Sequence, residues 1–297
     1  MKKALFKLTT LIAIVCVGFA CSKSDVEAPT SLFDYSSDGL IVTFTNMSKN
    51  ATSYVWDFGD GETSTEANPV HTYTTYGEFD VTLTATNEGG SKSVSETISM
   101  AKPLILIDGD FSDWSEVAAN KLFTTVVPSE TSYGKLKKVK VCADADFIYC
   151  YVEVDSVNVD PFSIMIDCDN NYLTGRQYYW NNAGLDICIE GRIQIHADTY
   201  LMDGDVYKGV GSGESGAWES DPTMLAGSNV VKCSSVKTVN GVQAFEIGII
   251  RAMLPTPISS STIKMCFKTN DAGWNKNGIL PLNADGSYNG PALDVTL

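Results

Sequence analysis

The chain has 297 residues, of which 36 are acidic and 21 are lysine or arginine, so its formal net charge is −15 at pH 7. Such an acidic chain lacks the basic surface that nucleic-acid phosphates require, which excludes nucleic acid as a partner. After Cys21 no segment is apolar over the length that spans a bilayer, and the remainder is long enough for two domains with cores of their own.

The N-terminal segment has the pattern of an export signal. Three lysines precede an apolar run at residues 8–20, which ends at Cys21. A basic start, a short apolar centre and small residues before a cleavage point are typical of secretory signals. The cysteine resembles that of bacterial lipoproteins, in which it becomes the lipidated first residue. We expect a signal peptide at residues 1–20, lipidation of Cys21 and a polar tether at residues 21–30, although Phe19 departs from the usual small residue.

Residues 54–87 combine a turn motif with an alternating strand. The motif Trp-Asp-Phe-Gly-Asp-Gly at residues 56–61 has the composition of a tight turn. Residues 79–86 alternate apolar with polar side chains, which predicts a strand with one buried face.

Two further pieces complete a family pattern. His-Thr-Tyr at residues 71–73 and Tyr-Gly-Glu-Phe at residues 76–79 follow the turn motif in an order that resembles the PKD family of immunoglobulin-like domains. The resemblance implies a β-sandwich spacer at residues 31–101. We expect Trp56 in its core and His71 packed and hydrogen-bonded. The alternatives are an exposed sugar-stacking role for Trp56 and metal ligation by His71.

The second part of the chain, residues 102–297, has the composition of an all-β domain. Residues 139–142 and 147–154 predict a hairpin across an Asp-rich turn, and helical patterns are scarce apart from one or two turns after Asp113. Many strands with Gly, Asn and Asp turns predict a β-sandwich or jelly roll. The other predicted strands are residues 162–168, 185–195, 200–202, 243–250 and 263–267.

A second resemblance begins at residues 107–114, Ile-Asp-Gly-Asp-Phe-Ser-Asp-Trp. This segment resembles the opening of family 9 carbohydrate-binding modules and the related DOMON-like sandwiches. A strand at residues 146–152, an acid-terminated strand at residues 164–169 and a last strand at residues 291–297 follow in the same order. The resemblance implies a carbohydrate-binding sandwich, with Trp114 buried at its corner.

Oxygen-bearing side chains follow one of these strands. Asp167, Asp169 and Asn171 stand at alternating positions ahead of Gly175. Calcium takes about six to eight oxygen ligands from carboxylates, amides and carbonyls, and the families resembled here often carry structural calcium. We therefore expect a calcium site, although not an EF-hand. The alternative is an Asx-rich turn that caps its own backbone.

Aromatic and polar side chains come next and again in two later loops. Sugar rings stack their C–H faces on aromatic rings, and their hydroxyls bind amides, carboxylates and guanidinium groups. We expect a ligand-binding surface built from these residues, with inward-folded tryptophan lids as the alternative. The candidates are Arg176, Tyr178, Tyr179, Trp180, Asn181, Asn182, Trp218 and Trp274.

Signals of catalysis are weak. The chain has no GxSxG, HExxH or Walker motif, and the GxGxxG at residues 211–216 does not open a helical pattern. Asp186 and Glu190 share the outward face of one predicted strand, which we interpret as a polar ladder rather than an acid–base pair. The six cysteines after residue 140 include no CxxC pair, so we expect mostly free thiols and no zinc site.

These features predict a non-catalytic protein that binds a polysaccharide or oligosaccharide. A lipid anchor would hold it on the outer membrane, facing the exterior, and a transporter complex there is a further expected partner. The architecture resembles the surface glycan-binding proteins of polysaccharide-utilisation systems in Bacteroidetes-like bacteria. The alternatives are an adhesion or scaffold protein that makes protein contacts, and a β-sandwich glycosidase or lyase.

Overall fold

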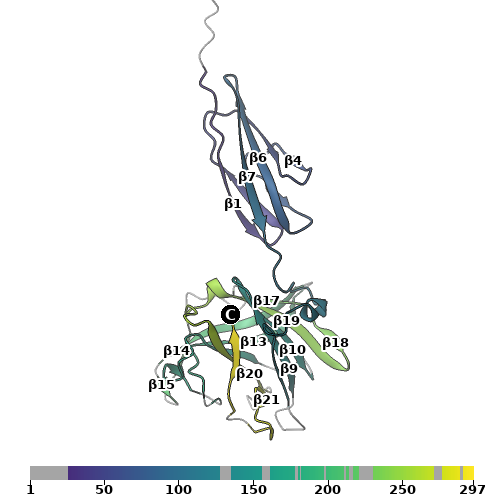
Figure 1. Ribbon diagram of the computed structural model, residues 1–297, viewed down its shortest axis with the longest axis vertical. Coiled ribbons are helices and arrows are strands. Elements are labelled where there is room, and N and C mark those ends of the chain that lie inside the picture. The colour runs from purple at the N-terminus through teal and green to yellow at the C-terminus, as the bar shows by residue number, and fades with distance from the viewer. Residues whose placement is uncertain are drawn as a thin grey trace, which may run out of the picture. The chain divides into compact units, whose positions relative to one another are not determined.

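The computed structural model describes residues 26–127, 135–155, 161–177, 180, 182–196, 199–210, 212–213, 217–220, 230–270, 276–287 and 290–297. The chain divides into two compact units, Met1–Lys102 and Pro103–Leu297 (Figure 1). Strands make up 55% of it and helix 4%, which confirms the predicted all-β fold of one β-sandwich followed by a larger one. None of the helices in the described ranges has the length and hydropathy of a membrane-spanning segment.

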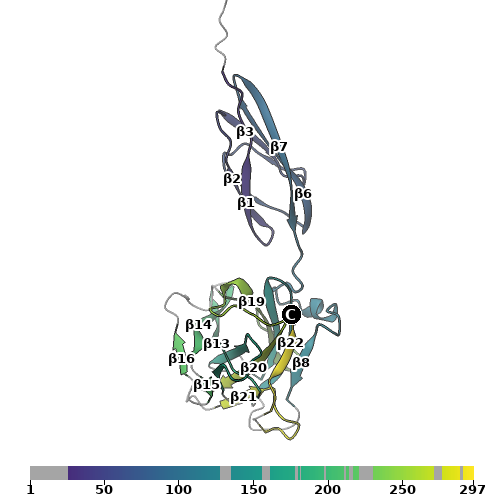
Figure 2. The ribbon, with the colours of Figure 1, turned by 60° about the vertical axis from the view of Figure 1, so that its left-hand side comes forward.

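The first unit is a sandwich of two antiparallel sheets (Figure 2). Alternate side chains point inward, as in β2, where Val42 and Phe44 are buried and their neighbours are not. Trp56 is fully buried between the sheets, as predicted, and its Nε1 donates to the Glu66 carbonyl at 2.9 Å. One sheet has the order β1 (Phe33–Asp38), β2 (Ile41–Asn46), β5 (Val70–Thr72); the other has β4 (Thr63–Ser64), β3 (Ser53–Asp57), β6 (Gly77–Asn87), β7 (Gly90–Met100).

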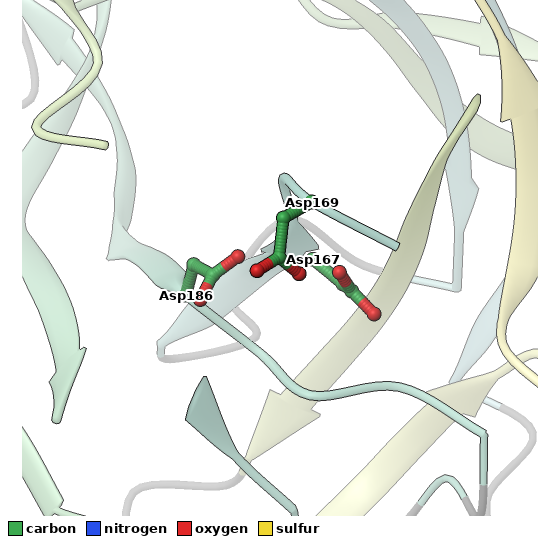
Figure 3. A group of neighbouring side chains, drawn as sticks. All are labelled: Asp167, Asp169 and Asp186. Carbon is green, nitrogen blue, oxygen red and sulfur yellow. The ribbon is translucent and has the colours of Figure 1, made fainter. Parts of the chain in front are cut away.

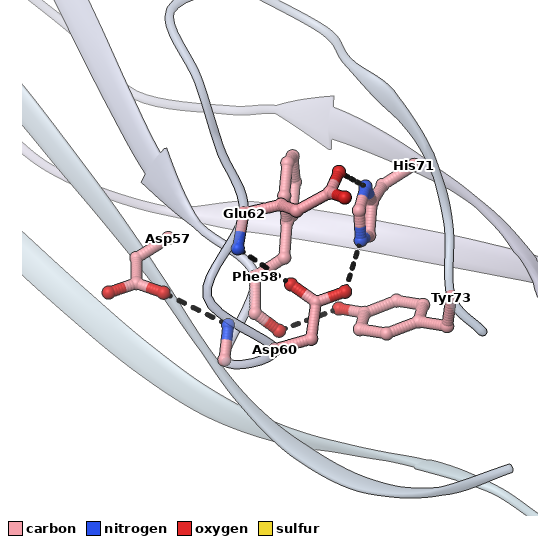
Figure 4. A network of polar contacts seen from close by, with 7 residues as sticks. Asp57, Phe58, Asp60, Glu62, His71 and Tyr73 are labelled. Atoms are coloured by element: carbon pink, nitrogen blue, oxygen red, sulfur yellow. Dashed lines mark hydrogen bonds and ion pairs between the residues drawn. The ribbon is translucent and has the colours of Figure 1, made fainter. Parts of the chain in front are cut away.

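A tight turn joins β3 to β4 (Figure 4). The Asp57 carboxylate accepts the N–H of Gly59 at 3.0 Å, and the Asp60 carboxylate accepts the N–H of Glu62 at 3.0 Å. Gly59 has φ of +79°, and a Cβ there would lie 2.7 Å from the Asp80 carbonyl oxygen. This position therefore requires glycine, which explains part of the turn motif.

His71 packs against the same turn. Its ring stacks on Phe58 with centroids 4.0 Å apart, and its Nε2 lies 2.7 Å from the Asp60 carboxylate. The hydroxyl of Tyr73 donates to the Phe58 carbonyl at 2.9 Å (Figure 4). Burial opposes the ionisation of Asp60, but the hydrogen bonds from His71 and the Glu62 N–H outweigh it and lower the pKa of Asp60. The prediction of a packed, hydrogen-bonded His71 is confirmed.

The second unit is one long antiparallel sheet that folds over on itself, with two short strands beside it. Its ends meet, because β21 contacts β9 and β22 contacts β8. The main order is β21 (Lys276–Leu280), β20 (Thr262–Asn270), β11 (Phe162–Asp167), β13 (Ile187–His196), β14 (Thr199–Val210), β17 (Val231–Cys233), β19 (Val242–Ile250), β10 (Phe147–Val154), β9 (Leu136–Ala143), β8 (Phe123–Val126). Side strands β16 (Ala217–Ser220), β18 (Lys237–Val239) and β22 (Leu293–Thr296) pair with β14, β19 and β20, while β12 (Gly175–Arg176) pairs with β15 (Ser212–Gly213).

The core of this unit lies between the two halves of the folded sheet. Phe162 of β11 and Phe245 of β19 meet edge to face with ring centroids 6.0 Å apart. Both are buried, and they belong to one apolar cluster that also includes residues of β9, β10, β13 and β20. The second unit is therefore a sandwich whose inner face is apolar, and polar side chains on these strands face outward.

The predicted hairpin and helix of this unit have different outcomes. β9 and β10 pair antiparallel, with Cys142 opposite Tyr149, which confirms the hairpin. The helical segment is a 3₁₀ helix at Phe111–Ser115, so its predicted position after Asp113 is wrong. The carboxylate of Asp110 accepts the Ser112 N–H, so the helix begins directly after Asp110 and before the predicted position.

The segment around this short helix is held to the sheet by a buried carboxylate. Trp114 is buried, as predicted, and its Nε1 donates to Glu246 Oε1 at 2.8 Å. The N–H of Gly109 donates to Glu246 Oε2 at 2.9 Å. Burial raises the pKa of Glu246 to about 7, and the negative charge of Asp108 adds to that rise.

The buried cysteines of the second unit are free thiols. Five of the six are buried in strands or beside them, where a thiol packs as a small apolar group. Their state agrees with the prediction of mostly free thiols.

Candidate functional site

The outer face of β20, β11 and β13 carries the candidate site. On β11 the side chains of Ile164 and Ile166 join the sandwich core, so the intervening side chains point to the opposite face. The pairing register then brings outer-face residues of three strands together: Ser163 pairs with Glu190 and Lys268, and Met165 pairs with Cys188 and Cys266.

A cavity of about 230 Å³ opens on this face. Its apolar lining comes from Met165 and Cys188, which belong to a second apolar cluster on this side of the sheet. Tyr207 of β14 and Trp218 of β16 pack partly against that cluster. The charged lining residues are Arg176, Glu190 and Lys268.

The charged groups of the cavity lie close together. The Ser163 hydroxyl donates to Glu190 Oε2 at 2.6 Å, and the Lys268 Nζ lies 3.9 Å from the same oxygen. Lys268 is only 8% exposed, so its ammonium is largely withdrawn from water. The Arg176 guanidinium carbon lies 5.6 Å from the centroid of the Trp218 ring, within the range of a cation–π contact.

Tyr207 keeps its proton at neutral pH. Burial raises the pKa of Tyr207 to about 12, and its hydroxyl donates to Asp205 at 3.1 Å, which favours the protonated phenol further. The cavity therefore combines aromatic rings with charged hydrogen-bonding groups, the two kinds of group that bind a polar ring-shaped ligand.

Short strand contacts place Arg176 at the cavity. Arg176 exchanges two backbone hydrogen bonds with Leu185, each of 2.9 Å. The preceding Gly175 has φ of +68°, and a Cβ there would lie 2.6 Å from the Leu185 carbonyl oxygen. Only glycine allows this close approach, which carries Arg176 across the end of β13 toward Trp218.

The sequence-predicted ligand residues have separate outcomes. Arg176 and Trp218 line the cavity, but Trp218 lies on a strand rather than in a loop because Gly209 of β14 pairs with it. The amide oxygen of Asn182 accepts the Ala292 N–H at 2.7 Å, which gives Asn182 a structural contact. Tyr178, Tyr179, Asn181 and Trp274 lie outside the described residues.

Trp180 contradicts the prediction of an exposed stacking ring. It is 2% exposed and packs in the apolar cluster with Met165, Cys188 and Cys266. Its Nε1 donates to the Pro281 carbonyl at 3.1 Å. Trp180 is therefore a lid over the sheet, because the outer face of these strands is apolar beside the cavity.

The sequence-based prediction missed five cavity residues. Met165, Cys188, Glu190, Tyr207 and Lys268 come from four strands, and only the pairing register brings them together. The alternation along residues 264–270 carries a signal for Lys268, but the predicted strand ended one residue before it.

Three carboxylates meet at the end of β11 (Figure 3). Asp167, Asp169 and Asp186 each offer an oxygen, and these oxygens lie within 4.8 Å of one another. Asp186 directly precedes β13, the antiparallel neighbour of β11, which brings it beside Asp167. Asp186 alternates with the core residue Ile187 and so shares the outer face with Glu190, as predicted, but at 9% exposure it is not solvated.

Asn171 is not part of this group. Its side-chain oxygen accepts the Leu173 N–H at 3.1 Å, as in an Asx turn. The Asp169 carboxylate accepts the Asn171 N–H at 2.9 Å and the Thr174 hydroxyl at 2.9 Å. The structure thus brings Asp186, which the prediction did not include, to Asp167 and Asp169, while the Asn171 side-chain oxygen is engaged within the turn.

The electrostatics of the three carboxylates are unfavourable without a cation. Burial, together with the negative charges of Asp186 and Asp169, raises the pKa of Asp167 to about 6. Burial also raises the pKa of Asp186, although the Cys168 N–H donates to it at 2.8 Å. Asp167 Oδ2 accepts the Gly184 N–H at 3.1 Å, whereas its buried Oδ1 has no hydrogen-bond partner among the described residues. A divalent cation would satisfy this oxygen and remove the repulsion.

A wider hollow of about 630 Å³ lies elsewhere on the second unit, between the β9–β10 turn and residues 259–261. Two of its charged groups, Asp144 and Arg251, already serve the fold. Arg251 donates to the Asp144 carbonyl, and the Asp144 carboxylate accepts the Tyr149 hydroxyl at 2.6 Å. We therefore place the candidate site at the smaller cavity, where aromatic and charged groups converge.

Residues 34–101 match the family described as PKD domain, which confirms the predicted PKD domain. The pre-pro-metalloprotease PrtV of Vibrio cholerae is 43% identical over 81 residues, which are 26% of this chain and 9% of that protease. The crystal structure of the PKD1 domain of that protease is 41% identical, with a TM-score of 0.24, and covers 26% of this chain and 100% of that domain.

A carbohydrate-binding module is also among the similar solved structures. A family 9 carbohydrate-binding module from Caldicellulosiruptor kristjanssonii, in complex with cellotriose, covers 58% of this chain and 76% of its own. It is 14% identical with a TM-score of 0.33, so it adds no argument to the geometry of the site.

Proposed function

We propose that the second unit binds carbohydrate, without catalysis, in the cavity beside Trp218. The observation that carries this proposal is the convergence of Tyr207 and Trp218 with Arg176, Glu190 and Lys268 around one small cavity. Aromatic rings match the C–H faces of a sugar, and charged hydrogen-bonding groups match its hydroxyls. At about 230 Å³ the cavity is smaller than the roughly 300–1,000 Å³ typical of drug-sized ligands, so it suits a single sugar ring.

The cavity favours binding over hydrolysis. Glycoside hydrolysis in its common forms needs two carboxyl groups on opposite sides of the scissile bond. Among its described lining residues the cavity has one carboxylate, Glu190, which accepts the Ser163 hydroxyl. A carboxylate engaged in this way can still accept a hydrogen bond from a ligand hydroxyl.

We also propose that Asp167, Asp169 and Asp186 hold a structural divalent cation, with calcium as the best match. The support is the close approach of their oxygens, the unpartnered buried oxygen of Asp167 and the all-oxygen donor set. A bound cation would neutralise part of the negative charge at the end of β11. It would also hold together the two ends of the segment between β11 and β13.

The place of the protein is a further part of the proposal. Cys21 and the signal segment lie outside the described residues, and their pattern supports export followed by lipid anchoring at the outer membrane, facing the exterior. The PKD domain would act there as a spacer between the anchor and the second unit. A single cavity gives weak affinity, so many anchored copies, and a transporter complex beside them, would retain a polymer.

The test is affinity electrophoresis of the mature protein against a panel of neutral and acidic polysaccharides. We expect retention by at least one polymer, loss of that retention in Trp218→Ala, and no change in Glu219→Ala. Glu219 is the exposed neighbour of Trp218 on the same strand, which makes it a matched control. Wild-type protein that no polymer retains, but that captures a protein in a manner insensitive to sugar, would instead support an adhesion or scaffold role.

A further inference from the structure

The cavity carries a positive charge on a strongly acidic protein. Arg176 and Lys268 contribute two cations and Glu190 one carboxylate, whereas the chain as a whole has a formal charge of −15. The Glu190 carboxylate is already engaged by the Ser163 hydroxyl at 2.6 Å and faces Lys268 at 3.9 Å. Among the described residues that line the cavity the two cations outnumber the one carboxylate, and the nearby Asp205 carboxylate is engaged by the Tyr207 hydroxyl at 3.1 Å.

The position of Lys268 strengthens this bias. Its side chain is withdrawn from water on the outer face of β20, and the ion pair with Glu190 is longer than a hydrogen bond. A largely desolvated ammonium interacts more strongly with an incoming anion than an exposed one does. Neutral sugars give such a group hydroxyl oxygens only, whereas an acidic sugar gives it a full opposite charge.

Arg176 covers one face of the Trp218 ring and so changes the chemical group that a ligand contacts there. Its guanidinium lies over the Trp218 ring, so on that face a ligand meets a cation stacked on an aromatic ring rather than a bare indole. A planar guanidinium matches the geometry of carboxylate and sulfate groups, which it can bind through two parallel hydrogen bonds. Tyr207 remains beside them as a ring and a neutral phenol.

We infer that this cavity selects an anionic sugar unit, with the acidic group against Arg176 and Lys268 and the ring beside Tyr207 and Trp218. The inference rests on the proposed carbohydrate binding and names its ligand class. A hexuronate carboxylate and a sugar sulfate share the required chemistry. At physiological ionic strength the Debye length is about 8 Å, so the nearby cations outweigh the net negative charge of the distant surface.

The experiment compares polymers that differ only in charge. The purified mature protein is titrated calorimetrically with polygalacturonate and with the same polymer after carboxyl reduction, and then with dextran sulfate and with dextran. We expect an acidic member of at least one pair to bind about tenfold or more tightly than its neutral counterpart. The pair that responds tells whether the group recognised is carboxylate or sulfate.

Two variants remove one cation each. Lys268→Met and Arg176→Gln should each weaken binding of the acidic polymer about tenfold, and should weaken binding of the neutral polymer, which loses only a hydrogen bond to a hydroxyl, by a clearly smaller factor. Lys92→Met makes the same charge change at an exposed position of the first unit and should have no effect. Thermal melting of each variant shows whether it is folded. The comparison of charged with neutral polymers uses the wild type alone, so it tests the inference even if a variant does not fold.

Two outcomes would overturn the inference. Equal or tighter binding of the neutral polymers would show that the cavity takes uncharged sugars, and the proposed function would stand without the charge selectivity. Absence of binding to all four polymers, and to the wider panel, would remove the proposed function together with the inference.

Discussion

The buried carboxylate of Glu246 offers the sharpest quantitative test of the fold. Glu246 Oε1 accepts Trp114 Nε1–H at 2.8 Å and Oε2 accepts the Gly109 N–H at 2.9 Å. Substitution Glu246→Gln replaces one of these acceptor oxygens with an NH₂ group that faces an N–H donor. The lost hydrogen bond and the buried donor left unpaired should cost about 1–3 kcal/mol in unfolding free energy.

The same substitution removes the charge, and this effect depends on pH. Burial raises the pKa of Glu246 from 4.5 to about 7 in the folded protein. A carboxyl group with a raised folded-state pKa stabilises the protein fully below the unfolded pKa and loses that contribution as pH rises through the folded pKa. Between about pH 5 and about pH 8 the wild type should therefore lose about 2–3 kcal/mol through this group, whereas Glu246→Gln should not.

The assay is chemical denaturation of both proteins at the two pH values. We expect the destabilisation of Glu246→Gln relative to wild type to shrink by about 2–3 kcal/mol from the lower to the higher pH. Glu219→Gln makes the same change at an exposed position and should show no such trend. A difference that stays constant or grows with pH would refute the reasoning, because the two N–H donors would then hold the ionised carboxylate more firmly than burial opposes it.

Three further predictions concern the acidic cluster, the lid and the PKD domain. Calcium at about 100 times its dissociation constant should stabilise the wild type by about 2.7 kcal/mol. Thermal melting with and without chelator would show this as a rise in melting temperature, which Asp186→Asn should lose. An unchanged rise in Asp186→Asn would exclude Asp186 as a ligand. Trp180→Ala should lower the free energy of unfolding of the second unit by about 3–5 kcal/mol, and with it the melting temperature, because the Trp180 ring is buried. Unchanged melting together with lost polysaccharide retention would instead favour the prediction that Trp180 is an exposed stacking ring. Asp60→Asn should destabilise the PKD domain by about 1–3 kcal/mol near neutral pH. The difference should vanish at acid pH, because the lowered pKa of Asp60 contributes stability that is lost as pH falls through that pKa. Unfolding followed by the fluorescence of Trp56 at several pH values tests this, and a difference that does not depend on pH would contradict it.

Local sequence patterns predicted the features that depend on neighbouring residues. Period-two alternation located β6, and the turn chemistry of residues 57–61 predicted the bend that His71 supports. The burial of Trp56 and Trp114 followed from their place beside turn motifs that resemble those of the two families. Each of these inferences needed only a short window of sequence.

The site depended on pairings that no short window contains. Asp186 joins Asp167 because β11 and β13 pair antiparallel, and Lys268 reaches Glu190 because β20 pairs on the other side of β11. The prediction that Trp180 is exposed failed for a related reason. The local sequence around a loop tryptophan does not tell whether its ring faces water or covers an apolar sheet. The sequence showed that aromatic and charged residues are frequent between residues 160 and 220. Which of them line the cavity depends on the strand register.

The proposed cation and the proposed sugar cavity are linked through one segment of the chain. Asp167 and Asp169 begin the segment between β11 and β13, and Asp186 ends it. Leu185, the neighbour of Asp186, holds Arg176 by two backbone hydrogen bonds of 2.9 Å, and Arg176 lines the cavity. A cation that fixes Asp186 against Asp167 would therefore also fix the backbone that positions the guanidinium. Because binding free energies are coupled in both directions, an anionic ligand that orders Arg176 should in turn tighten the hold on the cation, although the two sites share no ligand atom.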